Sequence, residues 1–76
     1  MPTLLLKDGF KFFFYANEHE PQHVHVMKGG NFCKVELSTL RVTQNYMKAA
    51  DLKKVLVLVE EHRKEFGRSW NAYFKR

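Results

Sequence analysis

Short runs rich in apolar residues occupy the first half of the chain, and the apolar–polar alternation within residues 23–28 and 32–40 is typical of β-strands. The runs are residues 3–6, 10–16, 23–28 and 32–40, with the turn sequences Asp8-Gly9 and Gly29-Gly30-Asn31 between them. Residues 41–44 are candidates for one more short strand. Residues 17–22 are expected to form a loop, because Pro21 cannot pair regularly within a sheet. The first half therefore predicts antiparallel strands joined by tight turns.

The second half has the pattern of a helix. No Pro or Gly interrupts the chain from about Tyr46 to Phe66, and Asn45 is suited to the N-cap position. Apolar residues recur there with a helical period, at Leu52, Val55, Leu56, Val59 and Phe66. We expect Gly67 to end or kink this helix, and residues 68–74 to add a short second helical segment.

Strands followed by a helix indicate the α+β class. The chain has 76 residues, which is enough for one domain only, so residues 1–76 are predicted to form a single α+β domain. The expected architecture is an antiparallel β-meander of about four strands, followed by one long helix and a short C-terminal helical segment.

The second predicted strand carries aromatic residues on both of its faces. Phe10, Phe12 and Phe14 alternate with Phe13 and Tyr15, whereas a strand half exposed to water is expected to be polar on one side. Either the C-terminal segment or a partner must cover the second face. Apolar patches on small proteins often mark interfaces, so self-association as a homo-dimer, or a complex with another protein, is predicted.

Composition and charge narrow the setting. Cys33 is the single cysteine, which excludes an internal disulfide and favours a reducing compartment. No apolar run approaches the roughly 18 residues that span a bilayer, and the start of the chain lacks the pattern of a signal peptide. A cytoplasmic protein without membrane contact is therefore expected. Residues 46–76 hold eight basic and four acidic residues and so carry +4 of the net charge of +5, which is compatible with nucleic acid or an acidic partner.

Three of the four histidines lie within ten residues, in the stretch NEHEPQHVHV. His23 and His25 are two apart on a predicted strand, so their side chains leave the same face, and His19 lies in the preceding loop. Imidazole suits two roles: ligand of a transition metal such as zinc or nickel, or general acid and base near neutral pH. If a metal binds, the predicted ligands are His19, His23 and His25, because no carboxylate has a clear ligand spacing.

The fourth histidine lies on the predicted helix. His62 falls on the apolar stripe, with Arg63 on its flank. If the helix covers the face of His23 and His25, all four side chains could share one site. If the helix covers the alternating valines instead, His62 is separate. A strand period of two leaves both arrangements open.

The same residues carry a resemblance to a known family. The start Met-Pro-Thr, the stretch FYANEHEPQHVHV, the following Gly-Gly, and VEEHRKEF with a later Trp70 resemble the domain of unknown function 4160, over nearly the whole chain. Departures from the family pattern are Glu20, where a proline is frequent, Val24, where an aromatic is frequent, and Met47, near which a proline is frequent. The resemblance implies a small bacterial α+β protein, often encoded beside another small domain in an arrangement suggestive of toxin–antitoxin modules. It also implies that His62 and Arg63 belong with the loop histidines.

Our leading hypothesis is a small component of a bacterial toxin–antitoxin-like module that acts as a metal-independent ribonuclease with a histidine-centred site. The catalytic candidates are His23, His25 and His62, two of which would serve as general base and acid. Arg63 would neutralise the phosphate, and His19 would bind and orient substrate or partner. This reaction needs no cofactor.

Two other hypotheses stay open. In one, the chain is a non-enzymatic module that binds a cognate small protein encoded nearby, with the histidines and aromatic residues as its surface. In the other, it is a histidine-rich domain that holds a transition metal. RNA is a possible partner, as the substrate of the predicted ribonuclease.

Overall fold

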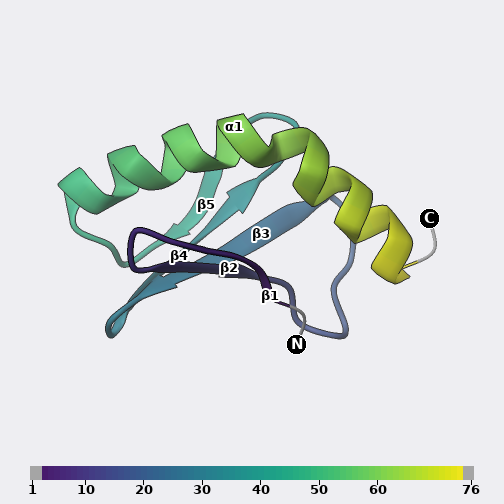
Figure 1. The fold of residues 1–76 in the computed structure, drawn as a ribbon, viewed down its shortest axis with the longest axis horizontal. Helices are drawn as coiled ribbons and strands as arrows, with labels where there is room; N and C mark the ends of the chain where they lie inside the picture. The colour runs from purple at the N-terminus through teal and green to yellow at the C-terminus, as the bar shows by residue number, and fades with distance from the viewer. Residues whose placement is uncertain (1–2, 75–76) are drawn as a thin grey trace.

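Five strands and one helix make up the computed structural model, which describes residues 3–74 (Figure 1). The elements are β1 (Thr3–Lys7), β2 (Phe10–Phe13), β3 (His23–Lys28), β4 (Asn31–Glu36), β5 (Val42–Asn45) and α1 (Ala49–Phe74). The strands lie side by side in chain order, and each neighbouring pair is antiparallel. The predicted α+β class and meander are confirmed, with five strands in the sheet where about four were expected.

The tight turns between the strands follow from residues that tolerate positive φ. Asp8 and Gly9 have φ of 55° and 84°, the left-handed pair that a two-residue hairpin with a right-handed twist requires. Gly29 has φ of 59° and opens the turn between β3 and β4. Asn31 was expected in that turn, but it pairs with Lys28 and begins β4.

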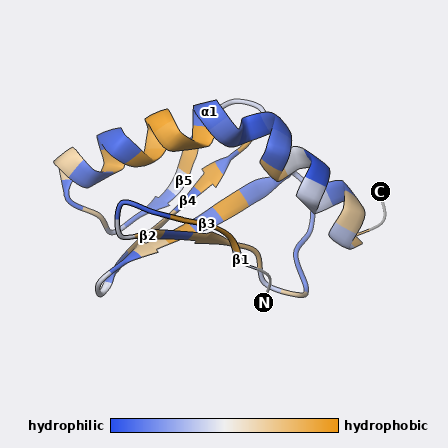
Figure 2. Ribbon diagram, viewed as in Figure 1, coloured by the Kyte–Doolittle hydropathy of each residue, from blue (hydrophilic) through white to orange (hydrophobic). Residues whose placement is uncertain are grey.

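The helix lies across one face of the sheet (Figure 1). Val24 and Val26 of β3 are fully buried beneath it, as are Cys33 and Val35 of β4. The hydropathy colouring shows apolar segments of α1 and of the strands alternating with polar ones (Figure 2). Since side chains alternate along a strand, His23 and His25 point to the opposite side of the sheet, which we call the open face.

The start of α1 differs from the sequence prediction. The helix begins at Ala49, and its first backbone bond runs from Leu52 N to Lys48 O at 2.9 Å. Asn45 ends β5 and is not the N-cap. Its Oδ1 instead accepts a hydrogen bond from the backbone N of Met47 at 3.0 Å, which turns the chain from the sheet toward the helix.

The expected break at Gly67 is absent, so the predicted separate C-terminal segment is wrong. One helix of 26 residues passes through Gly67 and carries the apolar stripe on from Phe66 to Trp70, which is fully buried. A glycine inside a helix costs about 1 kcal/mol, whereas burying a large apolar side chain contributes about 1.5–3 kcal/mol. The buried tryptophan therefore outweighs the glycine.

The helix end also explains part of the aromatic excess on β2. Phe14, just after the strand, is buried by Trp70 at 5.1 Å and Phe74 at 5.9 Å between ring centroids. Phe10 and Phe12 belong to the core beneath α1. Phe13 remains on the open face, where its ring lies beside Tyr15 and His25.

Candidate functional site

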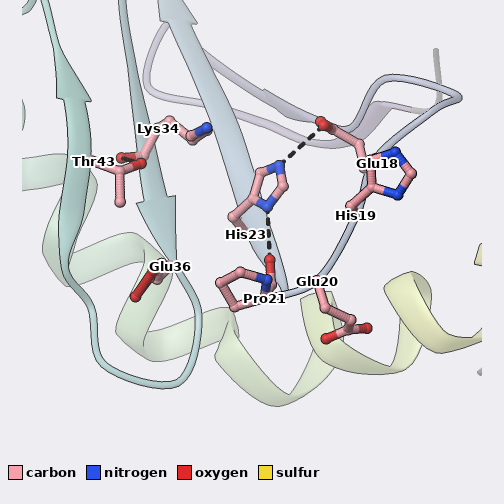
Figure 3. A pocket seen from close by; sticks show the side chains of 8 residues that line it. All are labelled: Glu18, His19, Glu20, Pro21, His23, Lys34, Glu36 and Thr43. Atoms are coloured by element: carbon pink, nitrogen blue, oxygen red, sulfur yellow. Dashed lines mark hydrogen bonds and ion pairs between the residues drawn. The ribbon is translucent and has the colours of Figure 1, made fainter.

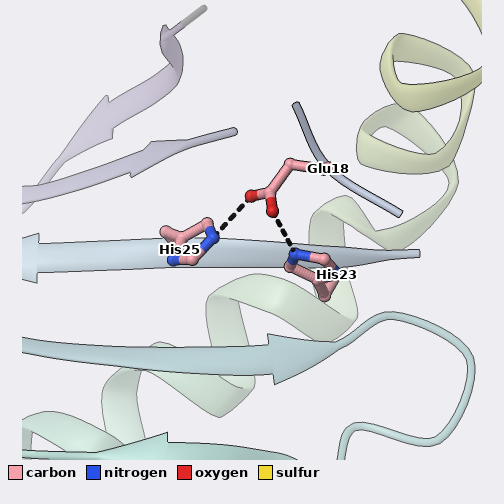
Figure 4. A group of neighbouring side chains, drawn as sticks. All are labelled: Glu18, His23 and His25. Atoms are coloured by element: carbon pink, nitrogen blue, oxygen red, sulfur yellow. Dashed lines mark hydrogen bonds and ion pairs between the residues drawn. The ribbon is translucent and has the colours of Figure 1, made fainter. Parts of the chain in front are cut away.

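Glu18, His23 and His25 converge on the open face of the sheet (Figure 4). One oxygen or nitrogen atom from each lies within 4.8 Å of the others. Glu18 Oε1 is 3.1 Å from His23 Nε2, and Glu18 Oε2 is 2.5 Å from His25 Nε2. The carboxylate thus lies between two imidazole rings that point their Nε2 atoms toward it.

Local backbone structure brings these three side chains together. Strand geometry places His23 and His25 on one face, two residues apart. Glu18 comes from the loop before β3, and its Oε2 accepts a hydrogen bond from the backbone N of Tyr15 at 3.3 Å, which folds the loop back onto the strand. Pro21, which follows a cis peptide bond, directs its carbonyl at the ring of His23.

The two ring nitrogens of His23 have different surroundings. Its Nδ1 donates to Pro21 O at 2.8 Å, which places a proton on that atom. In the neutral ring Nε2 then carries a lone pair. This atom is buried and has no hydrogen-bond partner among the described residues, because the nearby Glu18 oxygen is in ion-pair range without hydrogen-bond geometry. An unpartnered buried polar atom costs about 1–3 kcal/mol, and a bound cation would remove that cost.

His25 has the surroundings of a neutral imidazole. Burial lowers its pKa below the usual range, and the neighbouring His23 and Lys34 lower it further, while Glu18 acts in the opposite direction. Its ring is stacked on Phe13 at 5.5 Å and meets Tyr15 edge-on at 4.7 Å between centroids. Its Nε2–H donates to Glu18 in this arrangement.

Glu18 is ionised at neutral pH. Burial alone would raise its pKa, but the hydrogen bond from Tyr15 N and the neighbouring His23 and His25 lower it, and the net shift is downward. The site therefore offers one carboxylate and two imidazoles, the donor set found in many transition-metal centres.

A hollow of about 280 Å³ opens beside this group (Figure 3). It is lined by Glu18, His19, Glu20, Pro21, His23, Lys34, Glu36 and Thr43. Lys34 of β4 is the register partner of His25, so its ammonium group reaches the same face. The hollow gives a small molecule or a water access to the Glu18–His23 side of the group.

The end of α1 holds the loop of residues 17–22 in place. Trp70 packs its ring on His23 at 5.0 Å between centroids and donates from Nε1 to Glu20 Oε2 at 3.1 Å. Asn71, the next residue, accepts a hydrogen bond from Gln22 Nε2 at 2.8 Å. Because the helix fastens the loop at two points, the site is built on a supported segment and not on a free one.

The other predicted site residues lie elsewhere. His19 is exposed at the rim of the 280 Å³ hollow and is not part of the three-residue group. The ring of His62 stacks on Phe66 at 5.7 Å, and its Nδ1 is 3.2 Å from Glu65. Phe66 in turn packs on Phe12 in the core, so His62 lies on the helix side of the sheet.

Arg63 makes contacts that stabilise the fold and lie outside the candidate site. Its Nη1 donates to the backbone oxygens of Leu37 at 3.4 Å and Ser38 at 3.2 Å, in the turn after β4. The structure thus brings His23 and His25 together and leaves Arg63 and His62 apart from them. The valines of β3 determine this outcome, because their burial under α1 sends the histidines to the open face.

Glu18 and Lys34 are the residues that sequence analysis missed. Glu18 was not among the predicted ligands, because no carboxylate has a clear ligand spacing in the sequence. The signal that could have identified it is the loop itself, since a turn before Pro21 reverses the chain and lays residues 15–18 beside the start of β3. Lys34 could have been identified from the six-pair register that a two-residue Gly-Gly turn imposes on β3 and β4.

Fold and site together define a small α+β protein with a Glu–His–His group on the open face of a five-stranded sheet. The chain belongs to the family described as Domain of unknown function (DUF4160), whose model matches residues 9–71. This match confirms the predicted family, although Met1 and Pro2 of the starting motif lie outside the described residues. No curated protein and no solved structure matches the chain. Within residues 3–74, no helix combines the length and the apolar character needed to cross a membrane.

Proposed function

We propose that Glu18, His23 and His25 bind a divalent transition metal ion, and that the centre activates water or a substrate oxygen in the adjoining hollow. One observation carries this proposal: the buried Nε2 of His23 has no hydrogen-bond partner within residues 3–74 and lies 3.1 Å from a carboxylate that also contacts His25. A cation placed among the three side chains would give that nitrogen, and the carboxylate charge, a partner.

The donor set favours zinc over calcium or magnesium. Imidazole nitrogen is a ligand for zinc and its neighbours, whereas calcium and magnesium prefer oxygen alone. Two histidines and one glutamate supply three ligands, which leaves a fourth tetrahedral position for water, as is usual in catalytic zinc sites. Binding through His25 Nε2 would move the ring proton from Nε2 to Nδ1. Because only unprotonated imidazole binds a metal ion, affinity should fall at a pH low enough to protonate the ring.

Electrostatics supports a metal-dependent reaction on a phosphodiester over a metal-independent one. The ionised Glu18 lies between the two imidazoles, and its charge would repel a phosphate that approached them. A divalent ion would add two positive charges to the group and so more than offset the charge of its carboxylate. With Lys34 beside it, such a centre would attract an anionic substrate.

The metal-independent ribonuclease remains a second candidate, and one arrangement favours it. His23, His25 and Lys34 share the open face, so two imidazoles and a cation are available to one substrate without His62 or Arg63. In that reaction Lys34 would take the phosphate-neutralising role that sequence analysis gave to Arg63. A toxin–antitoxin-like role and a cognate small protein as partner likewise remain proposals.

Cobalt(II) titration of tag-free protein tests the metal proposal. We expect saturation at one ion per chain, with visible d–d absorption of the intensity of a four-coordinate site. Glu18→Gln, His23→Ala and His25→Ala should each abolish this absorption. The matched controls His19→Ala and His62→Ala remove other histidines and should retain it. Equal loss in His19→Ala, or no saturable absorption in the wild type, would refute the proposed ligand set.

A further inference from the structure

The open face of the sheet exposes more aromatic and apolar surface than a free polar face would. Tyr46 is 63 %, Tyr15 47 %, Phe32 40 % and Met27 39 % exposed. Phe32 and Tyr46 lie with their ring centroids 4.7 Å apart. The register places Met27 opposite Phe32, so these side chains form one continuous surface across β3 and β4.

A hollow of about 220 Å³ lies within this surface. It is lined by Phe13, Tyr15, His25, Met27, Phe32 and Gln44. The volume is below the range of roughly 300–1,000 Å³ that drug-sized ligands occupy, so it suits one flat ring system. Aromatic and thioether walls offer stacking to such a ring, and the Gln44 amide offers one donor and one acceptor to its edge.

Two lysines flank this hollow, and the carboxylate of Glu18 contacts the Nε2 of His25 beside it. None of the six lining residues is acidic. Lys11 lies on one side, with its Nζ 5.5 Å from the centroid of Phe13, and Lys34 lies on the other as the register partner of both His25 and Gln44. The whole chain carries a net charge of +5. A ligand with flat rings and flanking negative charges therefore matches the surface.

We propose that this face binds single-stranded nucleic acid, with one base in the 220 Å³ hollow, a second base against Phe32 and Tyr46, and Lys11 and Lys34 on flanking phosphates. Exposed aromatic rings on an antiparallel sheet hold unpaired bases in other single-strand-binding domains by the same stacking. A second copy of the chain is a poorer occupant, because face-to-face sheets would bring the two lysines of each copy against basic surface.

His25 connects this surface to the candidate metal centre. Its ring forms part of the hollow, and its Nε2 meets Glu18 on the other side. A strand held in the hollow would therefore pass the Glu18–His23–His25 group. The binding itself does not depend on the metal proposal, because Phe32, Tyr46 and Lys34 hold no metal in it.

Fluorescence anisotropy with labelled twelve-nucleotide strands of one mixed sequence, in the presence of a chelator, tests this inference. We expect single-stranded RNA or DNA to bind at least tenfold more tightly than the duplex, because paired bases cannot enter the hollow. Binding of either strand supports the proposal, and the ratio of the two affinities identifies which nucleic acid is preferred. Equal affinity for duplex and single strand would overturn it.

Variants locate the binding on this face. Phe32→Ala and Tyr46→Ala should each weaken binding about 5- to 100-fold, as expected for loss of one stacked base. Lys34→Ala should make the dependence on salt shallower by about 0.7 in the log–log slope, the value for one phosphate contact on a single strand. Phe32→Tyr keeps an aromatic ring at this position, so its affinity should stay close to that of the wild type.

Two control variants remove the same residue types from α1. Tyr73 is 45 % exposed and Lys53 is exposed, and both belong to α1 and not to the strands that form the proposed surface. Tyr73→Ala and Lys53→Ala should leave affinity unchanged. Equal weakening by Tyr73→Ala and Phe32→Ala would overturn the proposal, as would undetectable binding. Concentration-dependent dimerisation that Phe32→Ala abolishes would assign the face to a second copy and would also overturn it.

Discussion

The Nε2 atom of His23 is the most informative single atom at the residue scale. It is buried, its neighbour Nδ1 is committed to Pro21, and it has no hydrogen-bond partner among the described residues. A buried polar atom without any partner costs about 1–3 kcal/mol, and the Glu18 carboxylate 3.1 Å away reduces that cost for this atom. A metal ion bound to this nitrogen would offset the loss of stability that it causes in the metal-free protein.

His23→Phe tests this account of the atom. The phenyl ring keeps the packing on Trp70, loses the bond to Pro21 and removes the unpartnered nitrogen. Since loss and gain are each about 1 kcal/mol, the free energy of unfolding without metal should stay within about 1 kcal/mol of the wild type. Zinc should raise the midpoint of urea unfolding of the wild type and leave that of the variant unchanged. A large loss of stability without metal would show that the nitrogen has a partner after all.

Cys33 is also buried, but unlike His23 it is expected to be chemically inert. Burial raises the pKa of its thiol to about 11, above the ordinary value near 9, and the side chain is fully buried in the core. We expect alkylation by iodoacetamide at pH 8 to be slow in the native protein and fast in denaturant. Between pH 9 and 11 the unfolded chain releases this proton first, so stability should fall as the pH rises. Rapid native alkylation would contradict the burial.

The course of α1 through Gly67 gives a prediction at the scale of elements. A Cβ at this position would meet Gln22 Oε1 at 3.5 Å, an ordinary contact distance, and the residue lies within the helix. Gly67→Ala should therefore stabilise the protein by about 0.5–1 kcal/mol, the difference in helix propensity. Gly29→Ala is the matched control, and it should destabilise, since Gly29 has φ of 59°. Chemical denaturation measures both, and a destabilising Gly67→Ala would contradict the uninterrupted helix.

Arg63 connects α1 to the turn after β4. Its guanidinium group bonds two backbone oxygens and is half-buried. Arg63→Ala should lower the free energy of unfolding by about 1 kcal/mol, which is below the roughly 1.5–3 kcal/mol of a bond to a charged group because solvent weakens it. Lys64→Ala removes an exposed neighbour and should change little. Cobalt binding should be intact in both variants. If Arg63→Ala abolished cobalt binding while stability was unchanged, the structural role would be wrong.

At this scale the sequence predicted the elements better than their ends and faces. Asp8-Gly9 and the alternating valines and histidines identified the hairpin and β3, because turn chemistry and strand period are local properties. The end of α1 could not be predicted locally, since burial of Trp70 outweighs the break expected at Gly67. The face of the histidines was likewise decided by tertiary packing, which buried the valines.

The candidate site was predictable only in part for the same reason. His23 and His25 are two residues apart, so the sequence alone places them on one face. Glu18 joins them through a loop that Tyr15 N, Trp70 and Asn71 hold in place, and the helix residues are about fifty positions away in the chain. Contacts between residues so far apart in the chain produce no periodic pattern in the sequence from which they could be predicted.

The whole molecule combines a small core with two proposed functional surfaces on the side that α1 leaves uncovered. A domain of this size buries only about 60 % of its unfolded surface, so its stability is modest. An ion bound by Glu18, His23 and His25 would join the loop to β3 and stabilise the fold by about 2.7 kcal/mol at a hundred times its Kd. The basic aromatic surface beside the site would then present a strand to the centre.

X-ray absorption at the zinc edge of the one-to-one complex tests the central claim most directly, because it identifies the ligands of the bound ion. We predict a four-coordinate shell of nitrogen and oxygen at about 2.0–2.1 Å with the outer-shell scattering of two imidazole rings. His25→Ala should reduce that signal to one ring or remove the zinc. A shell without imidazole, a sulfur ligand at about 2.3 Å, or failure to retain zinc would contradict the Glu18–His23–His25 site.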